Sequence, residues 1–131
     1  MRPHLSDLDR MRARAKALRA RTLRADAKKA LRSSQLTLGQ FFEQLQRDDE
    51  ESAALSRLRI GEVLLAVPGI GEARADRALQ KAGVSGLRRV TALGVRQRER
   101  LSRELAPYLG AEQLRGLASR LAGDPEEGPR A

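Results

Sequence analysis

Apolar residues recur at helical spacing in the N-terminal part of the chain. They form a thin stripe made of Leu8, Met11, Ala15, Leu18, Ala27 and Leu31. This spacing predicts a helix of about 25 residues, and the capping-box pattern of Ser6 with Asp9 places its start at Ser6 or Asp7. Because so narrow a stripe cannot bury a helix on all sides, we expect the helix to lie across the body or to project from it.

Residues 33–34, both serine, end this pattern, and a second helix is expected after them. Thr37 and Gln40 repeat the capping-box spacing. A core-facing set follows, consisting of Leu38, Phe41, Phe42 and Leu45. The acidic run at residues 48–51 is predicted to be a solvated connector or the negative first turn of a short helix ending near Leu55.

Three more helices are predicted in the middle of the chain. The first covers residues 59–67 and ends at Pro68, which cannot continue the hydrogen-bonding ladder. The second covers residues 72–82 and ends at Gly83, and the third covers residues 95–105, before another proline. In the third helix the expected inward residues are Leu101 and Leu105, and the expected outward ones are Arg96, Arg98, Arg100 and Arg103.

The chain lacks the alternating apolar and polar runs of a β-sheet, so the predicted fold class is all-α. A further short helix is indicated by Leu114, Leu117 and Leu121. The predicted organisation is a basic N-terminal helix (1–33), a compact helical body (34–106), a short extra helix (107–122) and a disordered tail (123–131).

The formal net charge of +9 is unevenly distributed. Residues 1–32 hold eleven basic and three acidic residues, and residues 57–106 hold eleven and five. The connector at residues 33–56 holds one basic residue and five acidic ones. Two basic segments separated by an acidic connector favour a polyanionic partner. Most of the basic residues are arginine, whose planar guanidinium can donate two hydrogen bonds to a phosphate.

Several kinds of chemistry are excluded or lack candidates. The chain contains no cysteine, which excludes disulfides, zinc–thiolate sites and thiol catalysis. Its one histidine, His4, lies in a terminus expected to fray, and the carboxylates fall on exposed helix faces or in the connector. We therefore predict no enzyme activity, no catalytic residue, no metal and no cofactor. With no apolar run for a signal peptide or membrane span, a cytoplasmic location is expected.

The sharpest motif is Val-Pro-Gly-Ile-Gly at residues 67–71, between two predicted helices. The two glycines permit a tight turn and leave backbone N–H groups bare at the start of the next helix, where they can hold a phosphate oxygen. Ile70 is expected to point inward. Neither a dinucleotide fingerprint nor a P-loop fits, because there is no preceding strand, no third glycine and no following Lys-Ser/Thr. The alternative is an ordinary tight turn.

A second constellation is Arg88 with Arg89, within residues 84–94. Two arginines on a turn can reach the phosphate backbone on either side of a groove. Taken alone they mean little, because adjacent arginines are common in this chain.

The motifs from residue 55 to residue 101 resemble those of the actinobacterial integration host factor family, which is unrelated to the β-ribbon proteins of similar name. The matching stretches are Leu-Ser-Arg-Leu-Arg-Ile at 55–60, Leu-Leu-Ala-Val-Pro-Gly-Ile-Gly at 64–71, Arg88-Arg89-Val90, Leu93-Gly94 and Gln97-Arg98. The resemblance covers roughly residues 8–106. It implies a long basic N-terminal helix leading into a helix-two-turns-helix (helix-hairpin-helix) body, in a nucleoid-associated protein that binds duplex DNA and bends it or alters its topology.

Carried over position by position, the resemblance implies that the loop at residues 68–71 holds a phosphate. Arg88 and Arg89 then reach the minor groove, and the N-terminal arginines follow the backbone. The predicted DNA-contacting residues are Arg21, Arg24, Lys28, Arg32, Arg57, Arg59, Pro68, Gly69, Ile70, Gly71, Arg74, Arg88, Arg89, Thr91, Gln97 and Arg98.

The sequence also departs from the family pattern, as a divergent member would. Thr91 stands where a third arginine is usual, which weakens or reshapes the groove contact. Glu72 stands where a lysine is usual and would repel a phosphate beside it. The serine pair at 33–34 replaces a glycine-containing turn. The extension at residues 107–131 is longer than the family carries, and its slightly acidic balance predicts little contribution to duplex affinity.

The predicted function is non-enzymatic binding of double-stranded DNA with low sequence specificity, by a monomer in the nucleoid, with no membrane or small-molecule partner. One alternative is RNA binding, as in the small-subunit ribosomal protein with the same Gly-Ile-Gly hairpin, although Asp124, Glu126 and Glu127 make the tail acidic here. Others are a protein–protein adaptor that uses the basic helix, a glycosylase-type enzyme that needs a partner domain, or a first helix that is merely a solvated surface.

Overall fold

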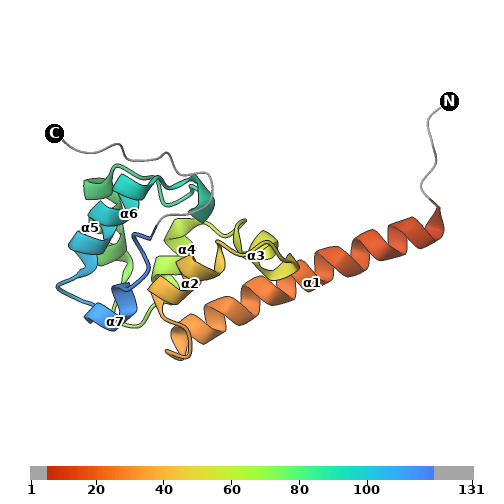
Figure 1. The fold of residues 1–131 in the computed structure, drawn as a ribbon, viewed down its shortest axis with the longest axis horizontal. Helices are drawn as coiled ribbons and strands as arrows, with labels where there is room; N and C mark the ends of the chain where they lie inside the picture. The colour runs from red at the N-terminus through yellow and green to blue at the C-terminus, as the bar shows by residue number, and fades with distance from the viewer. Residues whose placement is uncertain (1–5, 120–131) are drawn as a thin grey trace.

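The computed structural model describes residues 6–119, which form an all-helical fold (Figure 1). The helices in chain order are α1 (Asp7–Arg32), α2 (Leu38–Gln44), α3 (Glu50–Leu55), α4 (Ile60–Ala66), α5 (Glu72–Ala82), α6 (Val95–Leu105) and α7 (Ala111–Leu114), with a 3₁₀ turn η1 (Val90–Ala92) before α6. Within these residues no strand occurs, and one isolated antiparallel bridge joins Arg59 to Arg89. The predicted all-α class is confirmed.

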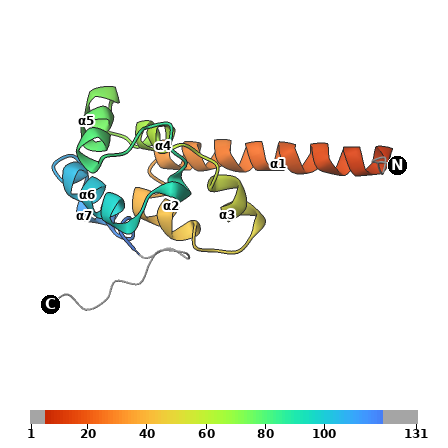
Figure 2. The ribbon, with the colours of Figure 1, turned by 90° about the horizontal axis from the view of Figure 1, so that it is seen from above.

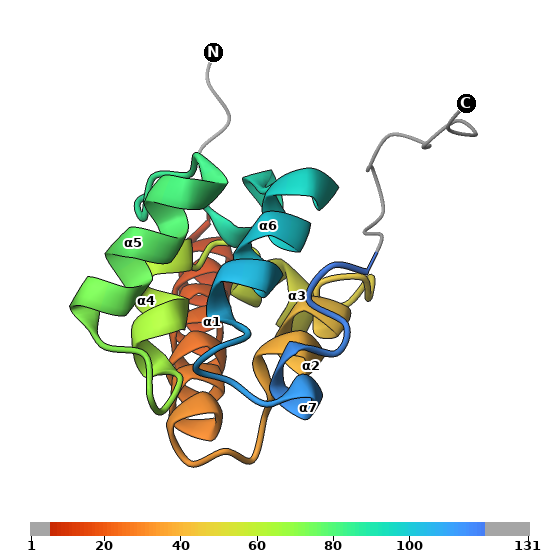
Figure 3. The same cartoon turned by 90° about the vertical axis from the view of Figure 1, so that its left-hand side faces the viewer.

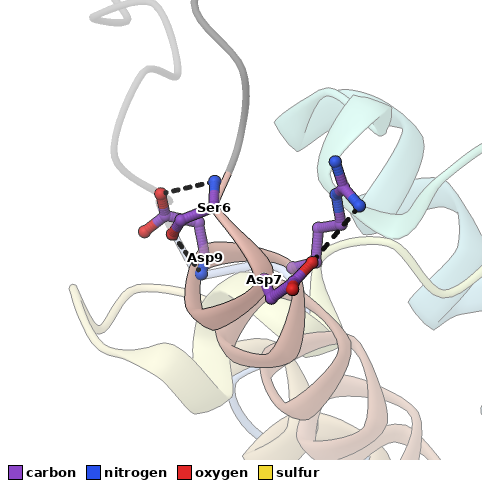
Figure 4. A network of polar contacts seen from close by, with 4 residues as sticks. Ser6, Asp7 and Asp9 are labelled. Atoms are coloured by element: carbon purple, nitrogen blue, oxygen red, sulfur yellow. Dashed lines mark hydrogen bonds and ion pairs between the residues drawn. The ribbon is translucent and has the colours of Figure 1, made fainter.

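Helix α1 begins and ends where the sequence predicts. The Ser6 hydroxyl accepts a hydrogen bond from the Asp9 amide at 3.1 Å, and the Asp9 carboxylate accepts one from the Ser6 amide at 3.4 Å (Figure 4). This reciprocal pair satisfies two amides that the first helical turn leaves without partners. At the other end the chain turns at Ser34, whose φ is +61°.

Only the C-terminal part of α1 lies against the body, where it packs on α3 and α4, while its N-terminal part extends well past them (Figures 1 and 2). Ala27 and Leu31 are buried there, and Leu23 is partly covered. Leu8 and Leu18, by contrast, are 53% and 60% exposed. The predicted single stripe is therefore wrong, because the apolar residues before and after Ala20 occupy different faces of the helix.

Two short helices, α2 and α3, follow α1 and support it. Thr37 and Gln40 form the predicted capping box at the start of α2, and Phe41 and Phe42 are fully buried with their rings edge to face, 5.6 Å between centroids. The acidic run forms the start of α3, one of its two predicted alternatives. There the Asp49 carboxylate accepts a hydrogen bond from the Ser52 amide at 2.7 Å, which lowers the pKa of Asp49.

The core of the body is formed by α4, α5 and α6, and α5 packs against both of the others (Figure 3). The bounds of α5 and α6 coincide with the predicted ranges. Gly83 ends α5 in the left-handed conformation, with a φ of +71°, as its position after the last apolar residue predicts. Leu101 and Leu105 of α6 are fully buried, as predicted.

The chain after α6 is built into the body. Helix α7 packs on α2, Leu117 is fully buried, and the Gln113 side chain accepts a hydrogen bond from the Leu38 amide at 3.0 Å. The helix predicted within residues 107–122 is much shorter than expected, because α7 ends at Leu114 and Gly116 adopts a φ of +94°. Leu121 and the predicted tail at 123–131 lie outside the described residues. None of the described helices is long and apolar enough to cross a membrane.

Candidate nucleic-acid interface

The loop between α4 and α5 has the tight form that its two glycines predict. Helix α4 ends before Val67, and Gly69 takes a φ of +91°, where a side chain would be strained. Ile70 is 4% exposed, which confirms its predicted inward position, and its amide donates to the Val67 carbonyl at 3.2 Å. The loop is thereby fixed from below, with its outer surface left to solvent.

This outer surface is suited to an anion. Gly71 is the N-cap of α5, and within residues 6–119 the amides of Gly69 and Gly71 donate to no protein acceptor. Arg32, the last residue of α1, lines the same open hollow as residues 65–71, with a volume of about 500 Å³. Two unbonded amides, the positive end of α5 and one guanidinium thus converge from opposite ends of the sequence, as a phosphate site requires. We call this the loop site.

Arg74, predicted to contact DNA, is engaged in holding the loop. Its guanidinium donates to the Gly69 carbonyl at 2.9 Å and lies over the ring of Tyr108, 4.2 Å from the centroid. The tyrosine comes from the segment after α6, which no sequence signal linked to the loop. Arg74 is therefore best described as a positioning residue for the loop site.

A second set of arginines is gathered by backbone pairing between residues 58–61 and residues 86–90. The amides of Ile60 and Val90 donate to the carbonyls of Arg88 and Leu58, both at 2.9 Å, and the amide of Gly61 donates to the carbonyl of Gly86 at 2.9 Å. Four exposed arginines are thereby brought onto one surface, and we call them the arginine cluster: Arg57, Arg59, Arg88 and Arg89.

Gly61 explains why this pairing is possible. A Cβ at position 61 would stand 2.9 Å from the carbonyl oxygen of Gly86, closer than side chains tolerate. The two glycines therefore allow α4 to begin directly against the turn that carries Arg88 and Arg89. Sequence reasoning missed both glycines, although a glycine in the first turn of a helix is a usable signal of close backbone approach.

The predicted contacts on α1 are divided between the fold and the surface. Lys28 forms an ion pair with Glu62 of α4, with Nζ 3.1 Å from Oε1, and Arg24 donates to the carbonyl of Ala54 at 3.4 Å. Arg21 is exposed and, with Arg24 and Arg57, lines a groove of about 820 Å³ between α1 and α3. Arg57 therefore joins the arginine cluster to the basic side of α1.

Glu62 is the carboxylate that fastens α1 to α4. Burial acts to raise the pKa of Glu62, but the hydrogen bond from the Arg59 amide, at 3.0 Å, and the nearby Lys28 ammonium outweigh it and lower that pKa overall. Glu62 therefore stays ionised at neutral pH, and Lys28 serves the docking of α1.

Arg98 is the clear correction to the predicted set. Its side chain is fully buried, and its guanidinium donates to the carbonyls of Leu117, at 3.3 Å, and Ser119. A group in this position cannot touch DNA while the C-terminal segment is packed, so the prediction of an outward, DNA-contacting Arg98 is wrong. Its role is to tie that segment to α6.

Three other positions differ from their expected roles. The Gln97 side chain accepts a hydrogen bond from the Gly94 amide at 3.0 Å and so caps α6. The Thr91 hydroxyl lies 3.4 Å from the Ser56 carbonyl, to which it donates. Glu72 lines the groove between α4 and α5 and is not among the residues of the loop hollow, so its charge faces away from the loop site. Within the described part of the chain, no cluster of metal-ligating side chains occurs.

The hairpin, its glycine loop and the second turn at Arg88 define a helix-two-turns-helix domain. Residues 31–105 match the S13-like H2TH domain family. The chain is also 33% identical over 102 residues to Integration host factor of Streptomyces coelicolor, covering 78% of this chain and 92% of that protein. It is 31% identical over 99 residues to Integration host factor of Mycobacterium tuberculosis, with 76% and 90% covered. The chain belongs to the actinobacterial integration host factor family, as its motifs predict.

A solved structure agrees with this membership. The structure of sIHF bound to an 8-base-pair palindromic DNA matches with a TM-score of 0.60 and 32% sequence identity, covering 69% of this chain and 97% of that chain. The H2TH match ends at residue 105, so the segment that holds Tyr108, α7 and Leu117 lies beyond it.

Proposed function

We propose that the protein binds double-stranded DNA with little sequence preference, through phosphate and minor-groove contacts, as a monomeric nucleoid-associated protein that bends DNA or changes its topology. The observation that carries the proposal is the backbone pairing that presents Arg57, Arg59, Arg88 and Arg89 on one exposed surface. The loop site adds a second set of phosphate contacts, made by backbone amides and Arg32. Neither site presents groups arranged to read base edges, which supports binding without sequence preference.

The family relationship supports duplex DNA as the partner, since the related sIHF structure holds a DNA duplex. The first test is fluorescence anisotropy of a random-sequence 25-mer duplex across a salt series, with a matched RNA duplex alongside. We expect affinity for DNA that falls steeply with salt and weaker binding of RNA. A preference for RNA, or no binding to either, would refute the proposal.

The arginine cluster is tested by replacing Arg88 and Arg89 with alanine together. Because each phosphate contact contributes about 0.9 to the slope of log K against log salt concentration, losing two should flatten that slope by up to about 1.8. The matched control is Arg96→Ala with Arg103→Ala, since both arginines are exposed on α6 and outside the two sites. An equal change in the control, or none in Arg88→Ala/Arg89→Ala, removes the cluster from the interface.

The loop site is tested by Gly71→Ala. Gly71 has a φ of −87°, and a Cβ there meets no atom within 4 Å, so the substitution leaves the fold undisturbed. The added methyl nevertheless stands at the amides that we propose hold the phosphate, and duplex affinity should fall by about tenfold, the effect of losing one to two hydrogen bonds to a charged group. Gly110→Ala is the control, because it also adds a Cβ in open space. Equal affinities for the two variants would exclude phosphate binding at this loop.

A further inference from the structure

The projecting half of α1 carries an apolar face that nothing in the described chain covers. Leu8, Met11 and Leu18 are 53%, 64% and 60% exposed, and Ala15 between them is also exposed. Their spacing of three, four and three residues keeps them in one row over three turns of the helix. Scattered surface leucines need no explanation, but a continuous row of large apolar side chains on a projecting helix is typical of an interaction surface.

This row points away from the body. Each residue advances a helix by about 100°, so the row lies about 150° around the axis from Ala20, Leu23, Ala27 and Leu31, which face α3 and α4. No movement of α1 that keeps its present packing can bury the row against the rest of the chain. The basic side of α1 that leads to Arg32 and the loop site lies beside the row, on a different part of the circumference.

The charges beside the row indicate what can cover it. Arg12 and Arg19 lie along one edge, and Arg14 and Arg21 along the other, so the row has the positions of a two-stranded helical seam with arginine at every flanking position within residues 12–21. A second copy of this chain, in either orientation, would place arginine against arginine along most of the seam. Such like-charge contacts act against self-association. A helix with acidic flanking residues would meet each arginine with a carboxylate.

DNA is also a poor occupant of this face. Phosphates can contact the arginines at the edges, but the leucine and methionine side chains would gain nothing from a charged backbone. We propose that the Leu8–Leu18 face of α1 docks an acidic amphipathic helix of a partner protein. The apolar row would supply the binding free energy, and the flanking arginines would supply the selectivity. This inference stands independently of DNA binding, because it uses a different face of the protein.

The test uses the full chain and three synthetic three-heptad peptides, with binding followed by anisotropy at physiological salt. The acidic seam peptide has Leu at the seam positions and Glu at the flanking positions. The second peptide has Ser in place of Leu, and the third has Lys in place of Glu. We expect micromolar binding of the acidic seam peptide, at least about tenfold weaker binding of the Ser peptide, and no binding of the Lys peptide.

The matched variant is Leu8→Gln with Met11→Gln and Leu18→Gln, which keeps every charge and alters only side chains that are more than half exposed. It should fold as the parent does and bind the acidic seam peptide at least about tenfold more weakly, with unchanged duplex DNA affinity. Equal binding of the Leu and Ser peptides, or equal binding by the variant and the parent, would overturn the proposal. So would a parent dimer in sedimentation that the variant abolishes, or a loss of DNA affinity in the variant. Those two results would assign the face to a second copy or to DNA.

Discussion

Replacing Gly39 with alanine should reveal how far the C-terminal segment belongs to the fold. Gly39 lies in the first turn of α2 and is buried against the backbone of Arg115, and a Cβ at position 39 would stand only 1.6 Å from the Arg115 carbonyl oxygen. Ordinary contact begins near 3.4 Å. One of the two backbones must therefore move by about 2 Å, and close-packed interiors do not absorb such a shift without losing contacts.

The magnitude follows from what the displaced segment contributes. Leu117 is fully buried and Leu109 is 8% exposed, and burial of a leucine contributes about 1.5–3 kcal/mol. The hydrogen bond from the Leu38 amide to Gln113 adds about 1 kcal/mol. Since the released segment regains conformational entropy, we expect a net loss of about 2–4 kcal/mol, in the range of severe core substitutions. In an ordinary helix the same change is stabilising by about 0.5–1 kcal/mol, so the sign itself is informative.

The assay is urea unfolding followed by circular dichroism, with hydrogen exchange at the Leu38 amide as a local measure. Gly39→Ala should lower the free energy of unfolding and accelerate exchange at Leu38, because that amide loses Gln113. Gly110→Ala is the control, since a Cβ there meets nothing within 4 Å. If Gly39→Ala is as stable as the parent or more stable, the segment does not pack on α2 in the way described.

Two further substitutions probe the buried charges. Arg98→Met should cost about 2–4 kcal/mol in urea unfolding, because two carbonyls of the C-terminal segment lose a charged donor. Duplex affinity should be unchanged wherever the protein is folded, and a selective loss of affinity would return Arg98 to the interface. Glu62→Gln should lower the free energy of unfolding by about 0.5 kcal/mol at pH 7, given that both partners are partly exposed. Since the folded pKa of Glu62 is lowered, this stabilisation is present above the unfolded value of about 4.3 and is lost as the pH falls through the folded value. Parent and variant should then converge near pH 3, and a constant difference would contradict the pairing with Lys28.

The predictable parts of the fold are those that local chemistry decides. The capping residues Ser6 and Thr37, the proline after α4 and the glycine after α5 each act within four residues of the boundary they set. The inward position of Ile70 followed from the same local logic. Because these effects need no knowledge of distant contacts, the bounds of α5 and α6 coincide with the predicted ranges.

The parts that failed depend on contacts between distant residues. Arg98 was predicted to face outward with its neighbouring arginines, but it lies three and seven residues before Leu101 and Leu105 and so shares their buried face. That spacing could have indicated burial, but its partners at Leu117 and Ser119 could not be foreseen. The stacking of Arg74 on Tyr108 is equally non-local. On α1 the apolar residues were taken as one stripe, although counting in steps of 100° separates them into two faces.

The structure changes the meaning of the chain's excess of arginine. Arg98 is buried, Arg74 holds the loop, and Lys28 and Arg24 fasten α1, so four of the predicted contacts also have structural partners. The exposed remainder is arranged in two places, at the arginine cluster and beside the glycine loop, and Arg21 and Arg57 line the groove at α1. A polyanion that follows α1 toward the body therefore meets guanidinium groups along the groove and at the cluster, and backbone amides with Arg32 at the loop. Because both sites rest on backbone hydrogen bonds and close glycine contacts rather than on flexible side chains alone, they are positioned before the partner arrives, which reduces the entropy lost on binding.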